Sequence, residues 1–178
     1  MGVCGFYIAP MRIDKAIEST MAMDDATWAR HANPLSFWTR VPLLLLLTLA
    51  IWSRVWIGWW CLVPVAGLIA WTFVNPRAFP PPQDLDDWAS KAVLGERFWL
   101  ARKTTPIPAH HARSALVLSV LSGLSLLPLG YGLWVLDPWA AFLGAVLASM
   151  FKLWFCDRMA WLTEDMTSSL AGDAVQQT

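Results

Sequence analysis

The sequence predicts an all-α integral membrane protein, with four transmembrane helices in two hairpins and one amphipathic helix on the cytoplasmic face. Three observations support this fold class. The 178 residues are 57% hydrophobic and 15% charged, whereas soluble domains carry about 25% charged residues. Four apolar runs approach the ~20 residues that cross ~30 Å of hydrocarbon. The 13 tryptophans cluster at the two ends of these runs, and an indole suits a membrane–water interface because it is apolar with one N–H donor.

A short helix is expected before the first apolar run. Asp24 and Asp25 stand in front of residues 26–31, and an aspartate side chain can accept hydrogen bonds from the free N–H groups of a first helical turn. The following Asn33-Pro34 step ends this helix and begins the next one.

The first hairpin is predicted from two apolar runs, with spans at 35–53 and 56–74. Arg54 lies between them. A single helix over the whole stretch would bury this guanidinium at the centre of the bilayer, at a cost of several kcal/mol. Two helices joined by a tight turn place Arg54 in the interface instead, so we expect a hairpin.

Between the hairpins, residues 84–103 predict an amphipathic helix. Acidic residues fill its first turn, and Arg102 and Lys103 end it, which complements the helix dipole. Asp87 and Lys91 form a favourable i,i+4 pair. The helix is too polar to span a bilayer and suits the membrane surface. The alternative is a packing helix in a small cytoplasmic cap.

The second hairpin is predicted from spans at 115–136 and 138–156, joined by an Asp-Pro turn. Small residues recur at helical spacing on both spans, including Gly123 and Gly130 on one and Gly144 on the other. Small residues let membrane helices approach closely. We therefore expect a tightly packed hairpin, with a homodimer seam as the alternative use of these stripes.

These elements make up one membrane domain over residues 23–166. Residues 1–22 are expected to be an N-terminal arm that is either disordered or the result of a misassigned start, because Met23 is one of several internal methionines. Residues 167–178 are expected to be a disordered tail. No secretory signal is recognisable at the N-terminus.

The charge distribution predicts an orientation. Of the 13 Lys and Arg residues, only Arg54 lies at the far ends of the spans. The positive-inside rule then places both termini and the middle loop in the cytoplasm, with the protein in the inner (cytoplasmic) membrane. The expected partners are membrane lipids, another membrane protein or a second copy of the chain. The net charge of zero gives no indication of a nucleic-acid partner.

Histidines and carboxylates on the cytoplasmic face are candidates for a divalent metal site, because imidazole and carboxylate groups bind zinc, iron or manganese. The candidate ligands are His31, His110, His111, Glu164 and Asp165. The pattern is not specific, since no HExxH motif is present and consecutive helical residues point about 100° apart. Solvated histidines beside a salt-bridged helix end are the alternative, and no other cofactor is predicted.

A second set of polar residues frames a possible pocket on the same face. Lys152 lies inside the last span, where it either snorkels to the interface or pairs with Asp157 or Glu164, or contacts a substrate or ion. The Asn-Pro steps either frame this pocket or simply cap helices. The full set is Asn33, Asn75, Arg77, Glu96, Lys152, Asp157 and Arg158.

The sequence lacks a Gly-rich phosphate loop, a serine nucleophile elbow and an acidic residue near the middle of a span. An enzyme is therefore not the favoured class. We expect an accessory or interaction protein that binds partner membrane helices or lipids. The alternatives are a metal-dependent enzyme at the membrane face, acting through the histidines and carboxylates, and an oligomeric channel or transporter.

Four stretches of the chain resemble a family of small prokaryotic multi-span membrane proteins of unknown function. They are WARHANPLSFWTR (28–40), NPRAFP (75–80), VLGER (93–97) and DRMAWLTEDM (157–166). The resemblance covers roughly residues 23–166 and implies a multi-span fold and a start near Met23. It implies no activity, cofactor or catalytic residue.

Overall fold

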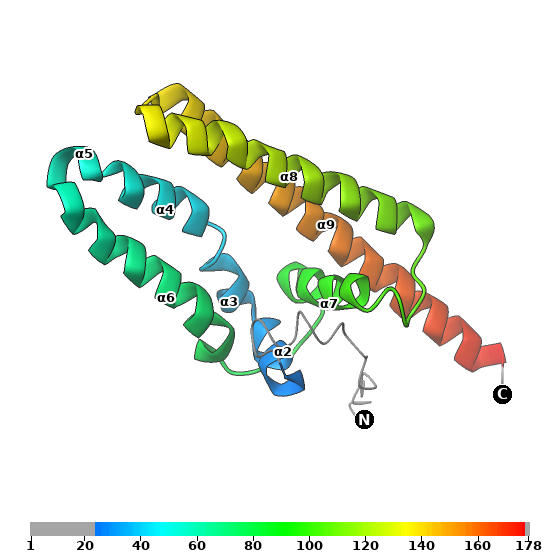
Figure 1. Cartoon of the computed structure of the whole chain (residues 1–178). Coiled ribbons are helices and arrows are strands. Elements are labelled where there is room, and N and C mark those ends of the chain that lie inside the picture. The colour runs from blue at the N-terminus through cyan, green and yellow to red at the C-terminus, as the bar shows by residue number, and fades with distance from the viewer. Residues whose placement is uncertain (1–23, 177–178) are drawn as a thin grey trace.

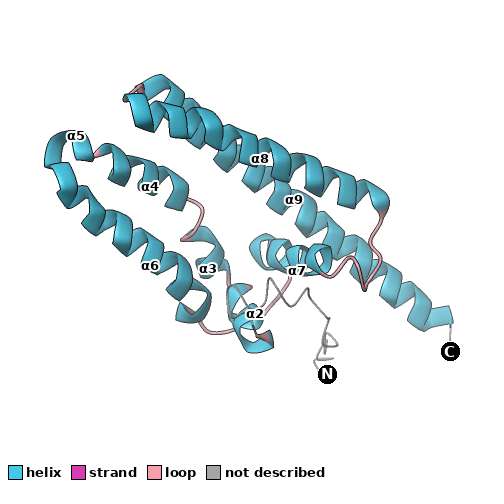
Figure 2. Ribbon diagram, viewed as in Figure 1, coloured by secondary structure: helices cyan, strands magenta, loops and turns pink. Residues whose placement is uncertain are grey.

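The computed structural model describes residues 24–176, and these residues form helices joined by short connections, with no strand among them (Figure 2). The predicted all-helical class is confirmed. Within this range three stretches are long and apolar enough to cross a membrane: Pro34–Ala78, Ala109–Val135 and Pro138–Ser169. They indicate a membrane protein. The predicted arm at 1–22 lies outside the described residues.

The first hairpin consists of α4 (Leu43–Trp52) and α6 (Leu62–Ala78), which run side by side in opposite directions (Figure 1). The short helices α5 (Arg54–Ile57) and η1 (Gly58–Cys61) make the turn between them. Gly58 has φ of 56°, in a region that residues with a side chain rarely adopt, so the glycine allows this turn. The chain therefore reverses close to the predicted position.

The predicted count of four spanning helices is wrong by the criterion of length and hydropathy, because the whole first hairpin counts as a single apolar stretch. Its two arms have 10 and 17 residues, which correspond to about 15 Å and 26 Å of helix and fall short of ~30 Å. The first arm is short because α3 (Pro34–Trp38) ends before α4 begins. Pro42 has no N–H to continue a helix through this point.

The second hairpin consists of α8 (Ala109–Val135) and α9 (Pro138–Gln176), which are in contact along their length (Figure 1). A β-carbon on Gly132 would lie 2.2 Å from the backbone N of Ala141, and one on Gly144 would lie 2.3 Å from that of Leu129. These glycines allow the close approach. Gly123 and Gly130 have open space around them, so the sequence identified the tight packing but named the wrong glycines on α8.

Both helices of this hairpin extend beyond the predicted spans. The helix α8 begins at Ala109 instead of residue 115, so His110 and His111 lie in its first turn. The helix α9 continues to Gln176, through residues that the sequence assigned to the tail. Asp137 accepts a hydrogen bond from the backbone N of Trp139 (2.9 Å), which stabilises the start of α9.

The helix α7 (Trp88–Leu100) and the short α2 (Asp25–His31) and α3 form a cap at the end of the molecule opposite the hairpin turns (Figure 1). Asp87 caps α7 by accepting a hydrogen bond from Ala89 N (2.8 Å), so the helix is shorter than the predicted 84–103. It packs closely on α9, where a β-carbon on Gly95 would lie 1.8 Å from the carbonyl oxygen of Met159. The alternative considered for this helix, that it packs within a small cap, therefore describes its position in the structure.

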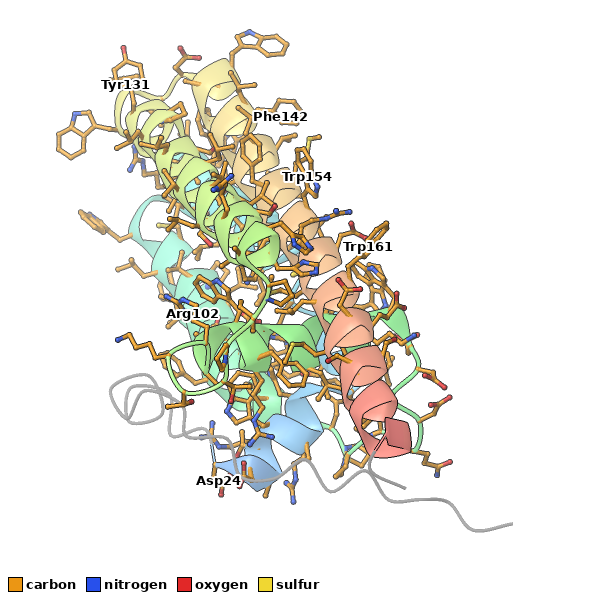
Figure 3. All side chains as sticks on the ribbon, turned by 90° about the vertical axis from the view of Figure 1, so that its right-hand side faces the viewer. Asp24, Arg102, Tyr131, Phe142, Trp154 and Trp161 are labelled. Carbon is orange, nitrogen blue, oxygen red and sulfur yellow. The ribbon has the colours of Figure 1, made fainter. Side chains whose placement is uncertain are left out.

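The surface of the two hairpins is largely apolar and rich in aromatic side chains. Figure 3 shows Tyr131 near the turn of the second hairpin, Asp24 at the opposite end, and Phe142 and Trp154 along α9 between them. Trp59 at the turn of the first hairpin is 85% exposed, and Trp134 at the turn of the second is 82% exposed. Such exposure of large apolar rings is expected where the surrounding medium is a membrane interface.

Candidate functional site

A pocket of about 450 Å³ lies between the two hairpins and the cap. Elements from both halves of the chain meet here, because α7 packs on α9 and α4 contacts both α8 and α9. Most of the wall is apolar and comes from the following residues: Phe37, Val41, Leu44, Val93, Leu126 and Leu153. The polar part of the wall is small and consists mainly of charged side chains and a histidine.

His31 and Arg40 form the first polar pair of the pocket. Arg40 Nη1 lies 2.8 Å from His31 Nε2, and Arg40 Nε donates a hydrogen bond to the carbonyl of Ser36 (2.9 Å). Because a guanidinium only donates, His31 Nε2 is the acceptor and the ring proton is on Nδ1. Burial lowers the pKa of His31 to about 3, and the Arg40 cation acts in the same direction. His31 is therefore neutral at physiological pH.

Glu96 and Lys152 form the second pair. Lys152 Nζ lies 3.1 Å from Glu96 Oε1 and 4.4 Å from the centre of the Phe155 ring. Burial alone would raise the pKa of Glu96, but the Lys152 ammonium, together with Arg40, brings this pKa below its ordinary value. Glu96 is thus a carboxylate. Of the partners predicted for Lys152, neither Asp157 nor Glu164 makes the contact.

The charges of the pocket do not cancel. Arg40 and Lys152 are cations, Glu96 is an anion and His31 is neutral, so the pocket has a net charge of about +1. In addition, Trp28 Nε1 and His31 Nδ1 are buried N–H donors with no hydrogen-bond partner among the described residues. Buried donors are nearly always paired. Excess positive charge and spare donors both favour an anionic, hydrogen-bond-accepting ligand.

The sequence pointed to part of this pocket. Glu96 and Lys152 were both named among the polar residues that frame a possible pocket. His31 was expected at a metal site and is instead bonded to Arg40. Arg40 and Trp28 were not predicted as site residues. The only signal for Arg40 was its position a few residues inside an apolar run.

The asparagines have structural roles. Asn75 is fully buried, accepts a hydrogen bond from Ser36 Oγ and donates one to Thr39 Oγ1, both at 2.8 Å. It therefore fastens α6 to α3. Asn33 caps α3 through Leu35 N (2.9 Å) and donates to the carbonyl of Pro80 (2.9 Å). Neither side chain lines the pocket. The capping alternative holds for Asn33, whereas Asn75 lies inside α6, which continues through Pro76 to Ala78.

A second group of candidate residues meets at the start of α8. His111 Nε2 lies 2.7 Å from Asp165 Oδ2 on α9, and His110 Nε2 lies 4.0 Å from the same oxygen. The two imidazole rings are 4.1 Å apart between centroids and tilted by 39°. One possible ligand atom from each residue falls within 4.8 Å of the others. Although the two histidines are consecutive, their rings lie together.

The sequence comparisons place this chain in a family. The model of the Family of unknown function (DUF6653) matches residues 12–178, a range that contains the pocket and the histidine cluster. The chain belongs to the DUF6653 family. No curated protein and no solved structure matches it. The matched range is longer at both ends than the 23–166 expected from the resemblance, and the family description states no activity.

The remaining candidates of this DUF6653 chain lie apart from both groups. Glu164 Oε1 is 3.1 Å from Lys91 Nζ, at the contact of α9 with α7. Asp157 Oδ2 accepts from Arg158 Nη2 (2.8 Å), and Arg158 stacks over the ring of Trp161, which Figure 3 labels on α9. Arg77 donates to the carbonyl of Phe73 (3.0 Å). These contacts join neighbouring elements or turns of one helix, and none of these side chains lines the pocket.

Proposed function

We propose that this protein binds an anionic amphiphile, a lipid or fatty acid with one negatively charged head group, in the pocket between its hairpins. The observation that carries this proposal is the combination of an apolar wall with a small, net positive polar region. The volume of about 450 Å³ lies within the range of small-molecule sites.

The head group would be recognised by the cations at the polar end. Glu96 offsets the charge of Lys152, with which it is paired at 3.1 Å, so Arg40 supplies the uncompensated charge. A guanidinium suits a carboxylate or phosphate because it presents several donors in one plane. A ligand oxygen would also provide an acceptor near the unpartnered donors of Trp28 and His31.

The tail would lie along the apolar wall. Leu44 and Leu126 belong to two of the stretches that are apolar enough to cross a membrane. Burial of hydrocarbon against such side chains contributes about 0.8 kcal/mol per methylene relative to water. A tail that enters the pocket from the bilayer gains less, because it is already surrounded by hydrocarbon. The choice between lipids therefore depends mainly on the head group.

The placement in the membrane follows from the charges. We propose that the cap faces the cytoplasm in the inner membrane, since the described Lys and Arg residues other than Arg54 belong to the cap or the span ends near it. The second hairpin would cross the bilayer, and the first apolar stretch, Pro34–Ala78, would enter the bilayer beside it. The exposed tryptophans at both hairpin turns would lie in the outer interface. The expectation that this protein binds helices of another membrane protein, or a second copy of itself, stays a prediction.

The test is a lipid-binding titration on the purified protein in detergent, with a spin-labelled fatty acid and a matched zwitterionic lipid. We expect a preference for the anion, and we expect Arg40→Met to weaken anion binding by roughly tenfold or more, because a hydrogen bond to a charged group contributes about 1.5–3 kcal/mol. Arg102→Met is the control, because this exposed arginine stacks on Trp99 outside the pocket and is labelled in Figure 3.

Equal binding of the anionic probe by the wild-type protein and Arg40→Met, or equal affinity for both probes, would overturn the proposal. Circular dichroism of each variant distinguishes loss of the site from loss of the fold.

A further inference from the structure

We infer that His110, His111 and Asp165 form a binding site for one divalent transition-metal cation, with Zn²⁺ as the appropriate probe. The site is separate from the amphiphile pocket, which none of these residues lines. Two imidazoles and one carboxylate are a typical ligand set for zinc and related cations.

The distances among the three side chains are close to those of a metal site, although the shortest of them, 2.7 Å from His111 Nε2 to Asp165 Oδ2, is also that of a hydrogen bond. In a tetrahedral zinc site with bonds of about 2.0–2.1 Å, neighbouring ligand atoms are about 3.3 Å apart. The two separations to Asp165 Oδ2, 2.7 Å from His111 and 4.0 Å from His110, lie on either side of this value. One ligand atom from each residue already lies within 4.8 Å of the others, so small movements of the exposed His110 and Asp165 side chains would bring all three ligands to one cation.

A hydrogen bond between His111 and Asp165 accounts for those two residues alone. It does not account for His110, because consecutive side chains of a helix leave its axis about 100° apart. The His110 ring nevertheless lies 4.1 Å from that of His111. Both rings approach the same carboxylate, and this convergence is what a shared cation requires.

The surroundings match a site that is formed in advance and open on one side. The side chain of His111 is only 4% exposed and lies where two packed helices meet, whereas His110 and Asp165 are 71% and 56% exposed. The next carboxylate, Glu164, is engaged by Lys91. The cation would therefore have three protein ligands and a remaining position for water or another small ligand, as in zinc sites that are not purely structural.

The experiment is zinc titration of full-length protein without a histidine tag, after removal of metal by a chelator. Calorimetry gives the affinity, and elemental analysis gives the stoichiometry. We expect about one Zn²⁺ per chain. We expect His110→Ala to weaken binding by roughly tenfold or more, since loss of even an outer-shell partner costs about 10–100-fold. His110 is exposed, so this variant tests the ligand without disturbing the core.

Glu164→Gln is the matched control, because it alters the adjacent carboxylate and leaves the cluster intact; we expect its zinc affinity to equal that of the wild-type protein. The inference fails if the wild-type protein takes up no stoichiometric zinc. It also fails if a folded variant with His110, His111 and Asp165 all replaced by alanine or asparagine still binds zinc with wild-type affinity. Lipid binding is measured in a separate titration, so the metal site and the amphiphile pocket can each be disproved independently of the other.

Discussion

At the scale of single residues, His31 shows how burial determines chemistry. An isolated histidine titrates near neutrality, but this one is 6% exposed and accepts a hydrogen bond from a guanidinium, so it is neutral. From the sequence alone it was a metal-ligand candidate because imidazole is a common ligand. Its actual partner, Arg40, was visible only as a cation near the start of an apolar run, and nothing local linked the two.

The lowered pKa of His31 predicts a pH dependence of stability. The unfolded chain binds a proton at this residue below about pH 6.5, whereas the folded protein does so only near pH 3. Between these values the unfolded state binds more protons, so the free energy of unfolding falls as the pH falls, by at most about 1.4 kcal/mol per pH unit from this group. Thermal unfolding in detergent at pH 7 and pH 5 measures the effect.

His31→Gln keeps a hydrogen-bond acceptor for Arg40 but does not titrate. We expect its stability to change less between pH 7 and pH 5 than that of the wild-type protein. The same slope in both proteins would show that His31 is not the source of the pH dependence.

At the scale of elements, the contact between α7 and α9 positions the pocket. It brings Glu96 to Lys152, 56 residues away in sequence. The close contact of Gly95 with the backbone of Met159 limits the rotation of α7 about its axis, because only a glycine leaves room there. The sequence indicated both helices and the turn at Asp137, because caps, turn residues and charge interruptions are local signals. It did not indicate which side chains meet between helices, because that depends on helix rotation and on close approaches such as this one.

Substitution of Gly95 tests this contact. Gly95→Ala places a methyl group against the carbonyl of Met159, so the helices must separate, and we expect a loss of about 1–3 kcal/mol in stability. Gly123→Ala is the matched control: nothing lies within 4 Å of its β-carbon position, and alanine favours a helix by about 1 kcal/mol over glycine. Chemical or thermal unfolding of both variants gives the comparison. A Gly95→Ala protein as stable as Gly123→Ala would contradict the close contact.

At the scale of the whole molecule, the fold separates an apolar pair of hairpins from a charged cap. Composition and the tryptophan clusters were sufficient to predict a helical membrane protein, because the solvent imposes those patterns on any such chain. The number of full-length spans was not predicted correctly. The break between α3 and α4 divides the first apolar run at Pro42, and the prediction took hydropathy over this run and overlooked the proline.

The proposed orientation predicts opposite accessibilities for the two ends. In intact cells, with native cysteines replaced, a membrane-impermeant thiol reagent should label Asp137→Cys, at the turn of the second hairpin, and should not label Asp86→Cys, beside the cap. Permeabilised cells should label both, which controls for expression and folding. The reverse pattern would invert the topology. Labelling of Asp86→Cys but not of Asp137→Cys after permeabilisation would show that the turn is buried.

The length of α9 has a mechanical consequence. Its 39 residues extend about 58 Å, roughly twice the thickness of the hydrocarbon layer, so one end must project well beyond the bilayer. This single rod carries Lys152 at one level and Asp165 about 20 Å further along. If thinning of the bilayer or a bound lipid tail tilted α9, Lys152 and Asp165 would both be displaced, because one continuous helix carries them. The pocket and the histidine cluster would then be mechanically coupled.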